Sequence, residues 1–153
     1  MSSAPTAIEI TRGDLFAVDV EAIVNPVNTR GVMGKGLALA FKKKFPDAFR
    51  AYAKACERGE VVVGRMHVVE RESKPRYVIH FPTKDDWRAP SRIEYVRDGL
   101  VDLVREMRER EIRSIAIPAL GCGLGGLDWD DVRPLIVAAL EAVEARVVVF
   151  EPS

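Results

Sequence analysis

The residues Ala22-Ile-Val-Asn-Pro-Val-Asn-Thr-Arg-Gly-Val-Met-Gly-Lys-Gly-Leu-Ala-Leu-Ala-Phe41 pass from an apolar run through a glycine-rich loop into a helix-forming segment. We predict a short buried strand at residues 22–25 that ends where Asn25 meets Pro26. The loop then supplies three glycines, Gly31, Gly34 and Gly36. Glycines let backbone N–H groups approach an anion closely, and a helix N-terminus adds partial positive charge. The stretch therefore predicts a loop that holds a phosphate group.

The composition is that of one globular domain, which we expect to span residues 1–153 after a loose start at residues 1–6. Hydrophobic residues make up 48% of the chain, and 23 basic side chains balance 23 acidic ones, so no overall field attracts nucleic acid. Cys56 and Cys122 form no CxxC pair, which argues against a metal site or a disulfide framework. The sequence shows neither a signal-peptide pattern nor an apolar run near the ~18 residues of a membrane span, so we expect a cytoplasmic protein.

Strand and helix patterns alternate along the chain. We expect strands at residues 8–12, 22–25, 64–70, 76–81, 113–120 and 146–150, with helical segments between most of them. This alternation predicts an α/β fold with a largely parallel sheet and helices on both faces. The chain stops directly after its last strand, as expected for a domain excised from a longer protein.

Two local signals lie between the fourth strand and the next helix. Pro82 is expected to end the strand and to begin a polar loop over residues 83–90. Ser91 with Glu94 three residues later predicts a capping box at the start of the helix that follows.

A second glycine-rich loop, Gly121-Cys-Gly-Leu-Gly-Gly126, follows the strand at residues 113–120. The helix after it begins Asp128-Trp-Asp-Asp131, and these carboxylates repel a phosphate at the helix N-terminus, so the loop would bind phosphate with its own N–H groups. Either loop alone is also explained as a tight turn. Two such loops at the carboxyl ends of parallel strands favour a nucleotide-diphosphate site.

Several motifs in this order resemble the macrodomain family: Gly13-Asp-Leu15, Ala22-Ile-Val-Asn-Pro-Val-Asn28, the loop to Gly36, and Ile117-Pro-Ala-Leu-Gly-Cys-Gly-Leu-Gly-Gly126. The resemblance implies a three-layer α/β/α fold around a mixed, mostly parallel six-stranded sheet, with ADP-ribose as ligand and no cofactor. Within the family, Gly36-Leu-Ala-Leu-Ala-Phe-Lys-Lys-Lys-Phe45 and Phe81-Pro-Thr-Lys-Asp-Asp-Trp-Arg88 are similar to the DarG-type branch. That branch removes ADP-ribose from thymidine in single-stranded DNA modified by a DarT-type toxin.

The resemblance also implies roles for individual residues. Asp14 is expected to accept a hydrogen bond from the adenine amine, and Asn28 to lie near the distal ribose. Trp87 and Arg88 are expected to contact single-stranded DNA, by stacking and by phosphate binding, or else to serve as a loop anchor and a surface charge. The expected ligand-binding residues are Asp14, Leu15, Asn25, Asn28, Gly31, Val32, Met33, Gly34, Lys35, Gly36, Pro118, Leu120, Gly121, Cys122, Gly123, Leu124 and Gly125.

Lys84 matches the lysine on which catalysis in this branch depends, and it is the expected catalytic residue. Its amine could attack C1″ of the ribose or assist by proton transfer; the other reading is a solvated loop lysine. Relatives that act on ADP-ribosylated glutamate carry an aspartate where this chain has Gly125, so their lysine-plus-aspartate mechanism is not expected. His80 precedes this segment and is a secondary candidate for a direct role, whereas Cys122 is expected to be a small filler.

The resemblance thus implies a hydrolase that removes ADP-ribose from single-stranded DNA and has a DarT-type toxin as a possible partner. A module that binds ADP-ribose without cutting it is the first alternative, which Gly125 favours. An enzyme acting on protein-linked or acylated ADP-ribose is the second.

Overall fold

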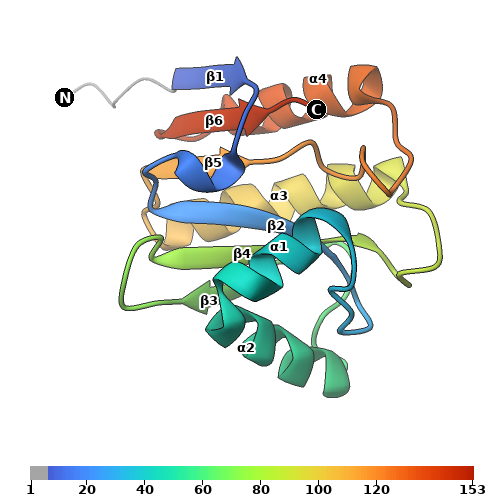
Figure 1. Cartoon of the computed structure of the whole chain (residues 1–153). Coiled ribbons are helices and arrows are strands. Elements are labelled where there is room, and N and C mark those ends of the chain that lie inside the picture. Colours follow the sequence, from blue (N-terminus) through green and yellow to red (C-terminus); the bar gives the residue numbers. More distant parts are fainter. Residues whose placement is uncertain (1–6) are drawn as a thin grey trace.

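The computed structural model describes residues 7–153 and shows a six-stranded sheet between two layers of helices (Figure 1). The strands, in the order β1-β6-β5-β2-β4-β3 across the sheet, pair in parallel except for the antiparallel pair β3–β4. The predicted mixed, mostly parallel six-stranded sheet is confirmed. The expected loose start at residues 1–6 lies outside the described residues. The elements are β1 (Ala7–Thr11), the short 3-10 helix η1 (Leu15–Ala17), β2 (Ala22–Asn28), α1 (Gly36–Lys44), α2 (Pro46–Glu57), β3 (His67–Glu70), β4 (Tyr77–Lys84), α3 (Ile93–Glu109), β5 (Ser114–Ile117), α4 (Trp129–Leu140) and β6 (Arg146–Phe150).

The alternation of side chains along each strand produces the three layers. Ala22 and Val24 of β2 join the core cluster that holds the apolar faces of α3 and α4, whereas Ile23 between them joins the cluster around α1. The same division holds for β6, where Val147 and Val149 face one layer and Val148 faces the other. Both faces of the sheet are therefore buried, as a parallel sheet requires, and the predicted three-layer fold is confirmed.

The centre of the sheet opens between β2 and β5. These strands pair at only two positions, Ala22 with Ile115 and Ile23 with Ala116, while β2 continues to pair with β4 up to Asn28. Beyond Ile23 the two central strands part, and each then leads into one of the glycine loops. The carboxyl ends of central strands are where open α/β sheets bind ligands.

Two prolines lie inside strands, contrary to our prediction. Pro26 does not end β2, and Pro82 does not end β4, which runs on to Lys84. A strand tolerates a residue without an N–H where it has a partner on one side only, and β2 beyond Ile23 has β4 alone. Lys84 is consequently the last residue of a strand and not part of a polar loop.

Three other boundaries differ from the prediction. The strands β3 and β5 are shorter than expected, at residues 67–70 and 114–117. The predicted capping box is wrong, because Arg92 occupies the N-cap position of α3 and its side chain makes no capping hydrogen bond. Ser91 lies one position too early to cap, and its backbone N–H donates instead to the Gly125 carbonyl at 3.0 Å.

Helix α3 crosses β4 at a glycine that permits close approach. A Cβ placed on Gly99 would lie 2.5 Å from two ring carbons of Phe81, which is fully buried in β4. The absence of a side chain at Gly99 thus sets the separation between the helix and the strand that carries Lys84. Within residues 7–153, no helix has the length and apolar character needed to cross a membrane.

Candidate functional site

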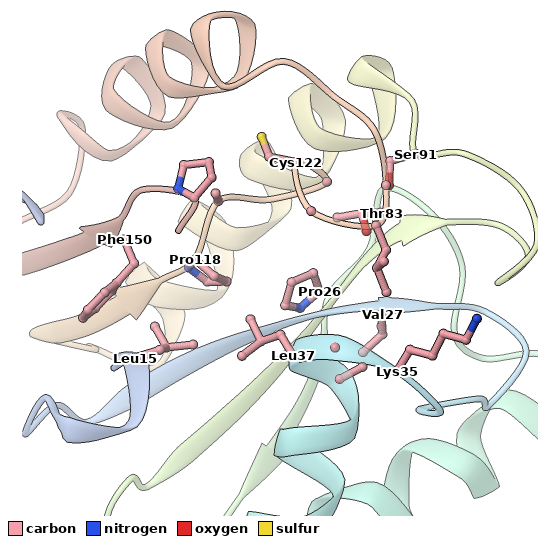
Figure 2. Close-up of a pocket in the computed structure, with 18 of the residues that line it drawn as sticks. Leu15, Pro26, Val27, Lys35, Leu37, Thr83, Ser91, Pro118, Cys122 and Phe150 are labelled. Atoms are coloured by element: carbon pink, nitrogen blue, oxygen red, sulfur yellow. The ribbon is translucent and has the colours of Figure 1, made fainter. Parts of the chain in front are cut away.

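A cavity of about 750 Å³ opens where β2 and β5 part, at the carboxyl ends of the central strands. Figure 2 shows Leu15, Pro118 and Phe150 toward one end and Lys35, Thr83 and Ser91 toward the other, with Leu37 and Pro26 between them. Both predicted glycine loops contribute to its wall. The cavity is lined by residues 13–16, 26–28, 32, 34–38, 83, 84, 87, 91, 118, 119, 121–125 and 150–153.

The first glycine loop ends at the N-terminus of α1, which is directed at the cavity. Gly36 begins the helix with φ of +58°, no acidic residue lies in the first turn, and the N-cap residue Lys35 adds a positive charge. Gly34, Lys35 and Gly36 all line the cavity. The helix dipole, the unpaired N–H groups and the lysine together favour an anion here, as we predicted from the sequence.

The second glycine loop is a series of tight turns over the opposite wall. Gly121 and Gly126 have φ of +74° and +82°, values that favour glycine, and the Gly121 carbonyl accepts the Leu127 N–H at 2.9 Å. Asp128 caps α4 by accepting the Asp130 N–H at 2.9 Å, so the acidic helix start lies beyond the loop. Residues 121–125 of the loop line the cavity, whereas residues 128–131 at the start of α4 do not.

The two loops approach each other across the cavity. The Leu124 side chain is 69% exposed, and its Cδ1 would lie 3.3 Å from a Cβ placed on Gly36. A diphosphate held between the loops would thus receive N–H groups from both walls. The nucleotide-diphosphate site predicted from the sequence would lie between these two loops.

A bulge in β4 brings two consecutive residues to the cavity. Val27 pairs with Pro82 and Asn28 pairs with Lys84, so Thr83 has no opposite residue in β2. Consecutive residues of a regular strand point to opposite faces, and a bulge re-aims them. Thr83 and Lys84 consequently both line the cavity.

Lys84 lies beside the second glycine loop, with its Nζ donating to the Leu124 carbonyl at 3.4 Å. The two aspartates that follow are engaged elsewhere. The Asp85 backbone carbonyl and carboxylate accept the hydroxyl of Thr29, and the Asp86 carboxylate accepts three hydrogen bonds from Arg88. These contacts hold both carboxylates in other interactions, so Lys84 is the charged group that this segment brings to the cavity wall.

The opposite end of the cavity combines apolar side chains with one carboxylate. Asp14 caps η1 by accepting the Phe16 N–H at 2.9 Å, which fixes the carboxylate at the cavity edge. The buried residues Leu15 and Phe150 lie beside it, and Leu37 comes from α1 (Figure 2). An apolar slot with a carboxylate acceptor suits a planar base that carries an amine, which is the role predicted for Asp14.

Four of the expected ligand-binding residues are not brought to the cavity. Asn25, Met33 and Leu120 are at most 3% exposed and pack below the loops, and Gly31 faces α2 near Cys56. The other thirteen line the cavity, and so do Lys84 and Trp87, whereas Arg88 lies just outside it. These four residues were expected in the site because they lie next to a glycine loop in the sequence, but in the structure they pack behind the loops.

Asn28 lines the cavity while its side chain holds the first loop in place. Its amide donates to the Val32 carbonyl at 2.7 Å, and its Oδ1 accepts the Arg30 N–H at 2.9 Å. From behind, the Tyr52 hydroxyl donates to the Asn28 backbone carbonyl at 2.6 Å. Asn28 therefore fixes the shape of the loop next to the expected position of the distal ribose.

The two histidines pair behind this network, His80 buried and His67 half-buried, and neither lines the cavity. Their Nδ1 atoms lie 3.0 Å apart, and the His80 ring packs 5.0 Å from that of Tyr52. Burial lowers the pKa of His80 to about 3, with a further contribution from His67. His80 is thus a neutral core residue, and the geometry does not support its secondary candidacy for a direct role.

The Ser91 side chain occupies the space that a side chain at Gly125 would need. A Cβ on Gly125 would lie 2.2 Å from Ser91 Oγ and 2.4 Å from the Gly121 carbonyl oxygen. Any side chain at position 125, including an aspartate, would displace the loop. Ser91 was missed from the sequence because its only signal there was a capping pattern. Its Oγ is buried and has no hydrogen-bond partner among the described residues.

Cys122 has the properties of a filler. Burial raises the pKa of its thiol to about 11, so the nucleophilic thiolate is scarce near neutral pH. Among residues 7–153, no three His, Cys, Asp or Glu side chains are grouped as a metal site would require.

Comparison with known proteins gives consistent matches over nearly the whole chain. The sequence profile of the Macro domain family matches residues 24–136. A DNA ADP-ribosyl glycohydrolase of Thermus aquaticus is 55% identical over 148 residues, which are 95% of this chain and 41% of that protein. The solved macrodomain of Thermus aquaticus DarG has a TM-score of 0.93 at 54% identity and covers 96% of this chain and 99% of that one. Thermosipho africanus DarTG in complex with ADP-ribose has a TM-score of 0.91 at 36% identity, over 95% of this chain and 42% of that one. The chain spans 41% of the length of the first curated relatives it matches.

Proposed function

Because the chain belongs to the macrodomain family, we propose that it binds ADP-ribose in the cavity and hydrolyses the N-glycosidic bond that links it to thymidine in single-stranded DNA. The observation that carries the proposal is the position of Lys84, whose amine lies 3.4 Å from a carbonyl of the second glycine loop inside the cavity. The 55% identity to a DNA ADP-ribosyl glycohydrolase supports the same reaction.

In this reaction the bond from C1″ of the distal ribose to the thymine nitrogen breaks. Water supplies a hydroxyl to C1″ and a proton to the nitrogen. Positive charge develops at C1″ as the bond breaks. The Lys84 amine either adds to C1″, opening the sugar to a Schiff base that water then hydrolyses, or moves the proton of the attacking water. Asp14 binds the adenine and the two glycine loops bind the diphosphate, and these contacts hold the substrate during the reaction.

Substrate and partner follow from the same proposal. Trp87 is half-exposed and lines the cavity on the side of Lys84, where it can stack on a base next to the modified thymidine. A DarT-type transferase, which would install the modification, is the proposed functional partner, and the resemblance to DarTG supports this pairing.

An ADP-ribosylated single-stranded oligonucleotide tests the proposal directly. The wild-type protein should release ADP-ribose, and Lys84→Ala should bind ADP-ribose with nearly unchanged affinity while losing at least about 100-fold in turnover. Lys84→Arg should also be inactive, because a guanidinium does not give up its proton. Lys74→Ala is the matched control, since Lys74 lies in the turn between β3 and β4, at the far end of β4 from Lys84, and pairs there with Asp19 from the segment before β2. Trapping with sodium borohydride separates the two roles, because only a Schiff base yields a covalent adduct.

A non-catalytic ADP-ribose-binding module is the second candidate, and the absence of a second carboxylate at Gly125 favours it. Binding of ADP-ribose without release from DNA, protein or acylated substrates would establish this reading. Release from protein-linked or acylated substrates but not from DNA would replace thymidine as the proposed attachment site.

A further inference from the structure

One ion cluster joins the first glycine loop to the segment after Lys84. The Asp86 carboxylate accepts hydrogen bonds from the Arg88 backbone N–H at 2.9 Å and from its guanidinium at 3.1 and 3.0 Å. The Arg30 guanidinium approaches the same carboxylate at 3.6 Å. Thr29, the neighbour of Arg30, donates its hydroxyl to Asp85. Two arginines from distant parts of the sequence are therefore held side by side by one acid.

The cluster presents its positive charge to solvent. The Asp86 side chain is 20% exposed, whereas those of Arg30 and Arg88 are 59% and 70% exposed. The hydrogen bonds from Arg88 also hold the pKa of Asp86 below its usual range, so the carboxylate stays ionised and keeps both arginines in place. Two cations with one largely covered anion leave an outer surface that suits a phosphate group.

An aromatic side chain adjoins the cluster on the side of the cavity. Trp87 is 49% exposed and lines the cavity, and the Arg88 guanidinium carbon lies 5.4 Å from its ring centroid. Cationic groups that follow a backbone, next to an aromatic ring on which a base stacks, are the combination that binds single-stranded nucleic acid. Arg30 and Arg88 do not line the cavity, so phosphates they bind would belong to a chain extending out of it.

We infer that Arg30, Trp87 and Arg88 form the surface along which single-stranded DNA leaves the cavity, with Trp87 stacking on the base next to the modified one and the two arginines binding its phosphates. This inference rests on the proposed function and adds to it the path of the strand. It assigns Arg30, in the first glycine loop, to DNA and not to ADP-ribose. It also assigns Asp86 the role of positioning both arginines.

Asp85 gives the inference a distinctive consequence. It is an exposed acid beside the cluster, and its side chain accepts the Thr29 hydroxyl at 3.2 Å. A carboxylate at this point repels a nearby phosphate. Asp85→Asn keeps an acceptor for Thr29 and removes that repulsion, so it should strengthen DNA binding.

The experiment measures two affinities in the Lys84→Ala background, one for free ADP-ribose and one for an ADP-ribosylated 15-nucleotide strand, and compares their ratio across salt concentrations. Arg30→Gln and Arg88→Gln together should weaken binding of the strand about tenfold and reduce its salt slope by ~1.4, that is ~0.7 for each lost phosphate contact. Their affinity for free ADP-ribose should not change. Trp87→Ala should weaken binding of the strand and leave the salt slope intact.

Arg76→Gln is the matched control, because Arg76 is 51% exposed, pairs with Glu70 and lies at the far end of β4. A double Arg30/Arg88 variant with the same salt slope as Arg76→Gln would overturn the inference, as would weaker binding of the strand by Asp85→Asn. Turnover by the Lys84-intact protein is measured separately. The two failures are therefore distinguishable. If the protein is not a hydrolase, turnover is absent; if the DNA surface is assigned wrongly, turnover is present but strand affinity does not depend on Arg30 and Arg88.

Discussion

Mild acid should destabilise this protein through His80, which is 1% exposed and stacks on His67 with their Nδ1 atoms 3.0 Å apart. The pKa of His80 is lowered to about 3 in the fold and is about 6.5 in the unfolded chain. Above the unfolded pKa the residue is neutral in both states and costs nothing. As the pH falls below 6.5, the unfolded chain takes up a proton that the fold rejects, so stability falls until the pH reaches the folded pKa.

Between pH 7.5 and pH 5.0 this linkage amounts to about 2 kcal/mol from His80 alone. For a chain of this size the corresponding change in Tm is about 4–8 °C. Asp47 and Asp86 have lowered pKa values and stay ionised between pH 7.5 and pH 5.0. Their titration therefore does not add to the stability change expected from His80. Urea unfolding at the two pH values, followed by circular dichroism, measures the difference.

The variant His80→Asn separates this effect from general acid sensitivity. It should lower stability at pH 7.5, because it leaves a gap beside Tyr52, yet its further loss at pH 5.0 should fall below about 1 kcal/mol. Equal unfolding free energies of the wild type at both pH values, within about 0.5 kcal/mol, would refute the reasoning. The same pH-dependent loss in His80→Asn would refute it equally.

Three further substitutions or modifications test other contacts. Gly99→Ala should cost about 1–3 kcal/mol, because its Cβ would lie 2.5 Å from the buried Phe81 ring, whereas Val101→Ala on the exposed side of the same helix should be near neutral; equal Tm values for the two variants would contradict the close packing of α3 on β4. Gly125→Ala should lower Tm through collision with Ser91 and Gly121, while Gly123→Ala, whose Cβ meets nothing within 4 Å, should not; the reverse order would show that the second loop does not pack on Ser91. Iodoacetamide at pH 8 should alkylate Cys122 at least about 100-fold more slowly than in the unfolded chain, because its pKa of about 11 leaves little thiolate. Mass spectrometry measures the rate, and a rate similar to that of the unfolded protein would contradict the role of Cys122 as a filler.

The alternation of strand and helix was predictable because both faces of the central strands are buried, so β2, β5 and β6 each contain a short apolar run. The ends of β2 and β4 were not predictable, because a proline is a local signal for a break. Whether a strand tolerates it depends on where the neighbouring strands stop: β5 pairs with β2 only as far as Ile23, and β3 pairs with β4 only as far as His80. The bulge that turns Thr83 to the cavity depends on the register between β2 and β4. No window of sequence around Thr83 contains that information.

The glycine loops were predictable as cavity walls, since positive φ values and close approach require glycine at positions such as Gly36 and Gly121. Residues that reach the cavity through tertiary packing had no such local signal. Ser91 comes from the segment before α3 and Phe150 from the end of β6, and both contribute ordinary side chains to the lining. Asn25 and Met33 show the converse error, because adjacency to a loop does not reveal which face a side chain takes.

The sheet is hydrogen-bonded as two halves, β1-β6-β5 and β2-β4-β3, which are joined by the pairing of Ala22 and Ile23 with β5. A ligand that contacts both glycine loops would therefore add a second connection between the two halves, beside the short β2–β5 pairing. Its binding energy would oppose separation of the two halves of the sheet. Amide hydrogens in the β2–β5 pairing, at Ala22 and Ile23, would then exchange more slowly in the complex. Ligand binding would in this way also stabilise the pairing of the two central strands.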